Sequence, residues 1–171
     1  MFTDTVPARM VLVGQAPGIV EHESGRPFSG RAGAELWRWM SRAGFASDDE
    51  FRREVYITAV TRCFPGRSPG GGGDRRPSTG EIVNCSRWID AELRLLRPDV
   101  ILAVGQLAIG RFLGPGRLED RVGRAFGDQP VVVPLPHPSG QSRWLNDLAN
   151  RERLARALKL VSELRCATKR S

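Results

Sequence analysis

Two short polar segments follow apolar runs near opposite ends of the chain. The first is GQAPG at residues 14–18, directly after the apolar run 10–13, and the second is HPSG at residues 137–140, after the apolar run 131–136. A neutral imidazole such as that of His137 can donate a hydrogen bond to an oxygen that becomes negative during a reaction. The hydroxyl of Ser139 and the N–H groups around Gly140 are suited to holding a phosphate. These groups indicate a site for a small polar molecule attached to a polyanion.

Each candidate residue also has an ordinary structural role, and the sequence leaves both open. A lone histidine is more often structural than reactive, and Gln15 has the alternative of bonding its own loop. Glu21 can orient a water or stabilise a developing cation if it faces the site, although most glutamates are simply solvated. Phe28, in the tight segment 25–30, offers a ring face for a planar group or packs into the core.

The elements that must position these groups are those of an α/β protein. Continuous apolar runs at 10–13, 55–60, 100–104 and 131–135 predict strands buried on both faces. Helical periodicity occupies 32–43, 80–96, 106–113 and 150–166, with Thr79 as the predicted N-cap of the second helix. The alternation predicts one domain over residues 1–171, a three-layer α/β/α sandwich around a four-stranded, mainly parallel sheet. In such a sheet, loops at the carboxyl ends of strands meet over one pocket.

The amino-acid composition limits the kinds of binding partner and the cellular location that we expect. The formal net charge is +7, with 26 Lys and Arg against 19 Asp and Glu, which favours a nucleic acid or another polyanion. No stretch is long and apolar enough to span a membrane, and no secretion signal is visible, so we expect a cytoplasmic location. We also expect the protein to be a monomer. Three cysteines at irregular spacing predict no disulfide framework.

A glycine-rich stretch at residues 66–77 precedes the second long helix. It lacks the Gly-Lys-Ser/Thr ending of a phosphate-binding P-loop. It is either a plain surface loop or a clamp whose Arg75 and Arg76 meet phosphates. Asp74, an acid in the same loop, could also turn toward the site, although an ordinary loop aspartate is the simpler interpretation.

Together these segments resemble the uracil-DNA glycosylase superfamily, and most closely its iron–sulfur branch, family four. That branch carries Gly-Glu-Ala-Pro-Gly, matched by residues 14–18, and Gly-Arg-Pro-Phe-x-Gly-x-Ala-Gly, matched by residues 25–33. A strand ending near a cysteine, a Pro-Thr/Ser-x-x-Glu-Ile helix with another cysteine and a His-Pro-Ser signature are matched by 55–63, 77–85 and 137–139. The likeness spans roughly residues 10 to 160, and motifs in this order are together specific.

The resemblance implies a DNA glycosylase of base excision repair, with uracil as the most favoured base. Such an enzyme flips a damaged base out of the duplex because its glycosidic bond is out of reach in the stack. The Phe28 position stacks on the base, and the His137 position stabilises the anionic leaving base. The resemblance assigns catalysis to Gln15, Glu21 and His137, base binding to Ala16, Phe28 and Ala59, and DNA binding to Ser139, Gly140, Arg143, Arg75 and Arg76.

Three departures from the family pattern bear on activity. Gln15 replaces the loop glutamate and cannot act as a carboxylate base, so that role shifts to Glu21 or to electrostatics alone. Ala59 replaces an asparagine that reads the edge of uracil, which should weaken selection against cytosine by about 1–3 kcal/mol. Cys63 and Cys85 match only the later pair of cluster cysteines, and two ligands do not make a four-cysteine cluster. We therefore expect no metal and no iron–sulfur cluster.

Two other functions remain open at this point. Gln15 and Ala59 also fit a catalytically weak or inactive relative that binds DNA or abasic sites. A binder or hydrolase of free nucleotides is a weaker alternative, since a free nucleotide needs no extended basic surface.

Overall fold

A four-stranded sheet forms the centre of the molecule. The computed structural model describes residues 8–70, 73–139 and 143–169. The strands are β1 (Met10–Gly14), β2 (Val55–Ala59), β3 (Val100–Val104) and β4 (Val131–Leu135). They lie in the order β2-β1-β3-β4, and each neighbouring pair is parallel. The four predicted runs are therefore strands, and the sheet is parallel throughout.

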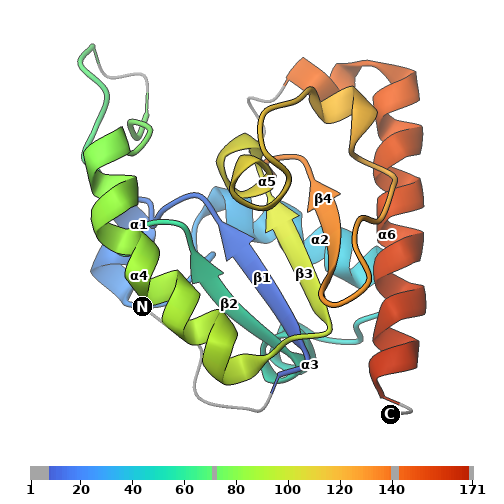
Figure 1. Ribbon diagram of the computed structural model, residues 1–171. Coiled ribbons are helices and arrows are strands. Elements are labelled where there is room, and N and C mark those ends of the chain that lie inside the picture. Colours follow the sequence, from blue (N-terminus) through green and yellow to red (C-terminus); the bar gives the residue numbers. More distant parts are fainter. Residues whose placement is uncertain (1–7, 71–72, 140–142, 170–171) are drawn as a thin grey trace.

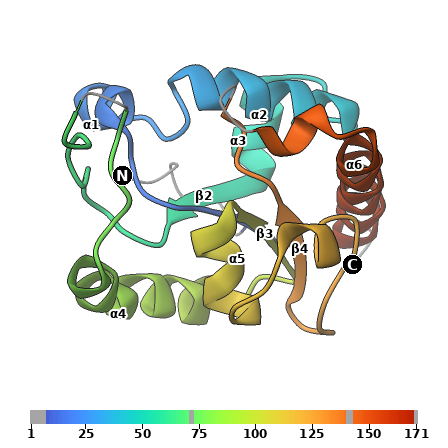
Figure 2. The same ribbon diagram turned by 90° about the horizontal axis from the view of Figure 1, so that it is seen from above.

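Helices cover both faces of this sheet, which confirms the three-layer sandwich (Figures 1 and 2). One face carries α2 (Arg31–Arg42), α3 (Asp48–Glu54) and α6 (Leu148–Thr168), and the other carries α4 (Thr79–Leu96) and α5 (Gln106–Leu113). Successive strand side chains point to opposite faces, so Leu12 packs with the first group and Val13 with the second. Because both faces are buried, β1, β3 and β4 are apolar at every position rather than at alternate ones, whereas β2 also carries the polar Thr58.

The start of α4 differs by one residue from the sequence prediction. Ser78, rather than the predicted Thr79, caps α4: its hydroxyl accepts a hydrogen bond from Glu81 N at 3.3 Å, and the Glu81 carboxylate accepts one from Ser78 N at 2.7 Å. This reciprocal pair is a capping box, which needs the serine three residues before the glutamate. The sequence did not predict α1 (Ile19–Ser24), α3, or the 3₁₀ turns η1 (Leu118–Asp120) and η2 (Arg143–Asn146).

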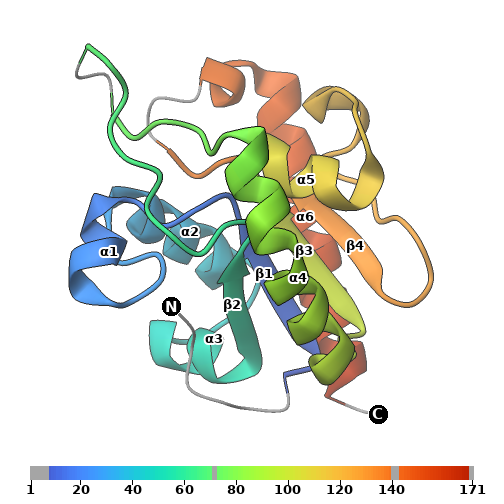
Figure 3. The ribbon, with the colours of Figure 1, turned by 60° about the vertical axis from the view of Figure 1, so that its left-hand side comes forward.

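The strand order fixes where a site can form. From β1 the chain winds to β2 on one side and later to β3 on the other, so loops leaving β1 and β3 diverge and open a crevice at the carboxyl edge. Figure 3 shows the segment between β2 and α4 rising above this edge beside α1. Among the described residues, no helix is both long and apolar enough to cross a membrane.

Candidate active site

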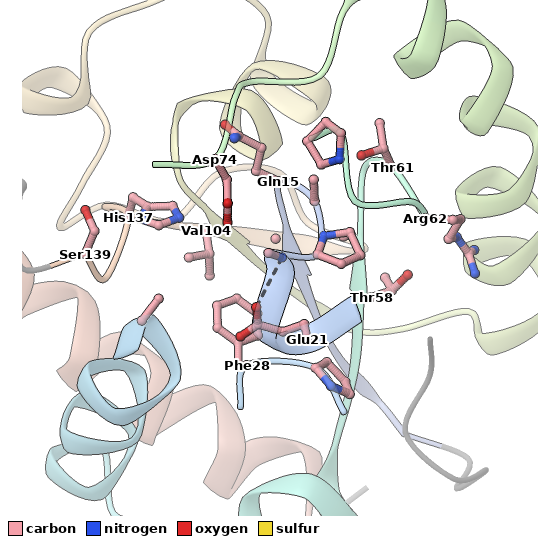
Figure 4. A pocket seen from close by; sticks show the side chains of 18 of the residues that line it. Gln15, Glu21, Phe28, Thr58, Thr61, Arg62, Asp74, Val104, His137 and Ser139 are labelled. Atoms are coloured by element: carbon pink, nitrogen blue, oxygen red, sulfur yellow. Dashed lines mark hydrogen bonds between the residues drawn. The ribbon is translucent and has the colours of Figure 1, made fainter. Parts of the chain in front are cut away.

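A cavity of about 320 Å³ lies at the carboxyl edge of the sheet. Loops that follow β1, β2 and β4, together with Val104 at the end of β3, line it (Figure 4). The residues predicted for the site that line it are Gln15, Ala16, Glu21, Phe28, Ala59, Arg75, His137 and Ser139. The two terminal signature segments therefore meet across one cavity, as predicted, although more than a hundred residues separate them. Its volume is in the range of small-molecule sites.

His137 stands on the wall formed by the loop after β4. Its ring lies against Gly105, where an added Cβ would be 3.4 Å from His137 Cδ2, and Gly105 has a positive φ of 85°. Figure 4 shows a ring nitrogen facing the cavity. The side chain is accessible to water from the cavity, yet protein surrounds it on the other sides, and this burial lowers the pKa of His137 below its ordinary value. The imidazole is therefore neutral at pH 7 and can act as a hydrogen-bond donor.

Phe28 forms an apolar face of the cavity in a strained backbone conformation. Its φ is +52°, a left-handed value that costs a non-glycine residue about 1–2 kcal/mol. The conformation is held from outside, since Arg52 donates to Pro27 O at 2.9 Å and to Phe28 O at 3.4 Å. A Cβ at Gly33 would lie 1.7 Å from Phe28 O, so only glycine allows α2 to approach this loop. Backbone strain of this kind persists only where neighbouring structure enforces it.

Glu21 links the segment 14–18 to the segment 25–33 that carries Phe28. One carboxylate oxygen accepts from Gly18 N at 3.1 Å, and the other accepts from Gly30 N at 2.9 Å. The carboxylate thus caps α1 and ties it to the loop that carries Phe28. Glu21 lines the cavity as predicted, but both of its oxygens already have backbone partners.

Backbone hydrogen bonds hold Gln15 in place, and Gln15 lines the cavity. Gly14 O accepts from Val60 N at 3.0 Å and Gln15 O from Thr61 N at 3.2 Å, which joins the loop after β1 to the loop after β2. Within the described part of the chain, the Gln15 amide makes no side-chain hydrogen bond to protein. It remains available to a ligand or a water.

The sequence did not predict the part of the cavity wall that the segment after β2 forms. Thr61 is only 2% exposed, lines the cavity, and its hydroxyl has no hydrogen-bond partner among the described residues. Behind it, Glu92 of α4 accepts from Tyr56 Oη at 2.8 Å and Thr58 Oγ1 at 2.9 Å, and pairs with Arg62 at 2.6 Å. Burial and the Glu92 charge both raise the pKa of Tyr56, which keeps its hydroxyl a donor. Only the polar residues after a predicted strand end hinted at this network.

The predicted DNA-binding residues divide by position. Arg75 lines the cavity but donates two hydrogen bonds to the Glu81 carboxylate, at 2.6 and 2.8 Å. That pairing, with the Ser78 cap, lowers the pKa of Glu81 to about 2. Arg76 and Arg143 are exposed and do not line the cavity. Gly140 lies outside the described residues.

Comparison with known proteins agrees with this geometry. The model of a family described as the uracil DNA glycosylase superfamily matches residues 2–161. The chain belongs to the uracil-DNA glycosylase superfamily. It is 35% identical over 138 residues to a type-4 uracil-DNA glycosylase of Thermotoga maritima. This aligned region covers 77% of this chain and 65% of the relative.

Other similar proteins are named type-4 or type-5 uracil-DNA glycosylases. The chain is 35% identical over 142 residues to a type-4 uracil-DNA glycosylase of Archaeoglobus fulgidus, covering 77% of this chain and 66% of the relative. It is 37% identical over 117 residues to a type-5 uracil-DNA glycosylase of Thermus thermophilus, covering 62% of this chain and 50% of the relative. The chain therefore spans between half and two thirds of the length of these curated relatives.

At two positions of the cavity, Gln15 and Ala59, this chain differs from the family-four pattern in a way that bears on function. Gln15 faces the cavity where the family-four motif has a glutamate, so no carboxylate enters from this position. Ala59 lines the cavity at the end of β2 and presents a methyl group where an asparagine would read a base edge. The side chains beyond it that carry donors or acceptors are those of Thr61 and Arg62.

The cysteines do not form the donor set of an iron–sulfur cluster. Cys63 is exposed after β2, Cys85 is half-buried in α4, and Cys166 is exposed in α6. No group of three or more His, Cys, Asp or Glu side chains suited to a metal ion occurs in ranges 8–70, 73–139 and 143–169. A four-iron cluster takes four thiolate ligands, so the cysteines of this chain do not fit that group.

Proposed function

We propose that this protein is a DNA glycosylase that turns a deaminated base, uracil above all, out of DNA into the cavity and hydrolyses its N-glycosidic bond in base excision repair. The observation that carries the proposal is the meeting of His137 and Phe28 at one cavity of about 320 Å³ in a basic member of the superfamily. An enzyme that acts on a base must first take it out of the stack.

The cavity residues support a division of labour. The Phe28 ring offers a face on which the flipped base stacks. The neutral His137 imidazole donates its N–H to the base oxygen on which negative charge develops as the C1′–N1 bond breaks. Ser139, Gly140 and Arg143 hold the DNA backbone beside the flipped nucleotide. Ala16 and Ala59 contribute apolar walls. Thr61, two residues after Ala59, lines the cavity with a hydroxyl that has no partner among the described residues, and this hydroxyl can bond the base edge.

The absence of a base-reading amide at Ala59 predicts relaxed base selection. A good pair of base-edge hydrogen bonds contributes about 1–3 kcal/mol of discrimination. We therefore expect measurable release of other deaminated bases, such as hypoxanthine and xanthine, beside uracil. We further propose that the protein acts as a cytoplasmic monomer without an iron–sulfur cluster.

The test is base release under single-turnover conditions with protein in excess. Labelled single- and double-stranded oligonucleotides carry uracil, hypoxanthine, xanthine or thymine, and the abasic product is cleaved and counted on a gel. We expect uracil release, and a loss of about 100-fold or more in His137→Ala because an oxyanion donor is removed. Binding of DNA with a stable abasic analogue should change less than about threefold in this variant.

The outcome also separates the two candidate functions. Tight, salt-sensitive binding to abasic DNA with no release of any deaminated base would favour a DNA-binding relative without activity. Equal release by the native protein and His137→Ala would remove His137 from the mechanism. Thymine-containing DNA of the same sequence is the negative control.

A further inference from the structure

Two carboxylates line the described part of the cavity, and they are not equivalent. Each oxygen of the Glu21 carboxylate accepts a hydrogen bond from a backbone N–H group, of Gly18 or of Gly30, and these bonds hold it at the start of α1. The other carboxylate belongs to Asp74, in the glycine-rich loop between β2 and α4. Its one hydrogen bond to a described residue is long, 3.4 Å from Ile19 N to Oδ2.

The stem of the glycine-rich loop is built so that Asp74 faces the site. Arg67 and Asp74 form an antiparallel bridge, flanked by hydrogen bonds from Ser68 N to Gly73 O at 2.8 Å and from Arg75 N to Gly66 O at 2.9 Å. The bonds between Arg75 and the Glu81 carboxylate at the start of α4 anchor the next residue. Backbone bonds therefore fix the positions on both sides of Asp74.

The Asp74 side chain extends from this stem over the first signature loop. A Cβ at Gly18 would lie 2.8 Å from Asp74 Oδ2, so the carboxylate is in close contact with the backbone at the start of α1. Figure 4 shows it pointing into the cavity on the side of the His137 ring. The loop thus places a negative charge at the mouth of the cavity, where Gln15 has none to offer.

We propose that Asp74 is the catalytic carboxylate of this site; the inference rests on the glycosylase function proposed above. As the C1′–N1 bond breaks, its electron pair leaves with the base and positive charge develops at C1′ and the ring oxygen. The Asp74 carboxylate stabilises that charge and accepts a proton from the water whose oxygen bonds to C1′. The products are an abasic sugar bearing a hydroxyl at C1′ and the free base, which takes up the proton, so that Asp74 is ionised again.

Electrostatics gives this role a distinct signature. A carboxylate beside a nucleotide repels the phosphates of bound DNA in the ground state and attracts the cationic sugar in the transition state. Neutralising it should therefore slow the chemical step without weakening binding. A merely structural side chain would behave otherwise, since its loss would disturb binding and chemistry together.

The test compares Asp74→Asn with Asp128→Asn, a matched change at an exposed residue that precedes β4 and does not line the cavity. Single-turnover uracil release and the Kd for abasic-analogue DNA are measured for each. We expect Asp74→Asn to release uracil about 100-fold more slowly, the scale of general base catalysis, with a Kd that is unchanged or tighter. Asp128→Asn should match the native protein in both measurements.

Chemical rescue adds an independent readout. Formate, a small carboxylate, should restore part of the activity of Asp74→Ala and none of the activity of His137→Ala. An active native protein with an equally active Asp74→Asn would overturn this inference alone, as would parallel losses of rate and binding. A native protein that releases no base would overturn the proposed function and this inference with it.

Discussion

At the scale of single residues, two residues that line the cavity are in conformations or environments that cost free energy. Phe28 has a left-handed backbone with φ of +52°, and Thr61 buries a hydroxyl that has no partner among the described residues. Both features cost stability, and such departures from local preference concentrate at functional sites. The composition of the sequence gave no warning of either, because both depend on neighbours distant in the chain.

His137 gives a prediction on stability and pH. In the unfolded chain its imidazole takes up a proton near the ordinary value of 6.5, whereas burial holds the pKa lower in the folded protein. Below pH 6.5 the unfolded state therefore binds this proton more readily, so the free energy of unfolding falls as pH drops from 7.5 to 5. The loss is complete once the pH lies below the folded pKa.

Urea unfolding of the native protein and His137→Asn at several pH values checks this prediction. The variant should lose less stability between pH 7.5 and 5. The window stays above 4.5, the ordinary value for Glu54 and Glu119, whose pKa values the fold lowers. The same pH dependence in both proteins would contradict the prediction.

At the scale of elements, two short helices do most to position the site. α1 contributes Glu21, which joins two signature loops, and α3 contributes Arg52, which holds the carbonyls of Pro27 and Phe28. These helices have only 6 and 7 residues. Helices this short depend on tertiary contacts and caps rather than on periodicity, which is why the apolar pattern did not predict them.

Arg52→Ala tests the support of the Phe28 loop. The side chain is 14% exposed, bonds Asp48 at 2.7 Å and reaches both loop carbonyls. Its removal should lower the free energy of unfolding by about 1.5–3 kcal/mol, because hydrogen bonds of a charged group are lost. Uracil release should slow as the ring of Phe28 loses its fixed position.

Arg53→Ala is the matched control, since this neighbour in α3 is exposed. It should change neither thermal stability nor base release appreciably. An Arg52→Ala protein with native kinetics would show that the loop keeps its strained conformation without α3.

At the scale of the whole molecule, the sheet and the charge act together. The parallel sheet brings its loops to one edge, and a formal net charge of +7 favours approach of a polyanion to the protein. Ion pairs reduce the number of arginines free to contact phosphates, as the bonds of Arg75 to Glu81 illustrate. Net charge alone therefore overstates the number of phosphate contacts.

Salt dependence measures those contacts directly. If about three phosphates are neutralised, affinity for abasic-analogue DNA should fall roughly 10- to 100-fold between 50 and 200 mM salt. Arg143→Gln should weaken binding to all sequences and reduce the slope of log K against log salt by about one. An affinity insensitive to salt would point to a small-molecule ligand instead.

The sequence by itself determined the strands, the long helices and the two signature loops. Continuous apolar runs have few alternatives to buried parallel strands, and GQAPG and HPSG occur where those strands end. The same information placed Gln15 and His137 at one cavity, because parallel strands share a carboxyl edge, whereas Phe28 was placed there by the family resemblance. It also identified the superfamily before any coordinates.

Only the tertiary structure decided how the carboxylates are used. Glu21 faces the cavity, as the sequence suggested, but its oxygens cap α1 and bind Gly30 N. Asp74, in a loop that composition describes only as glycine-rich, points into the cavity because a bridge and an ion pair fix its stem. Which acid is free for chemistry depends on hydrogen bonds between segments far apart in the chain, and no local pattern encodes those.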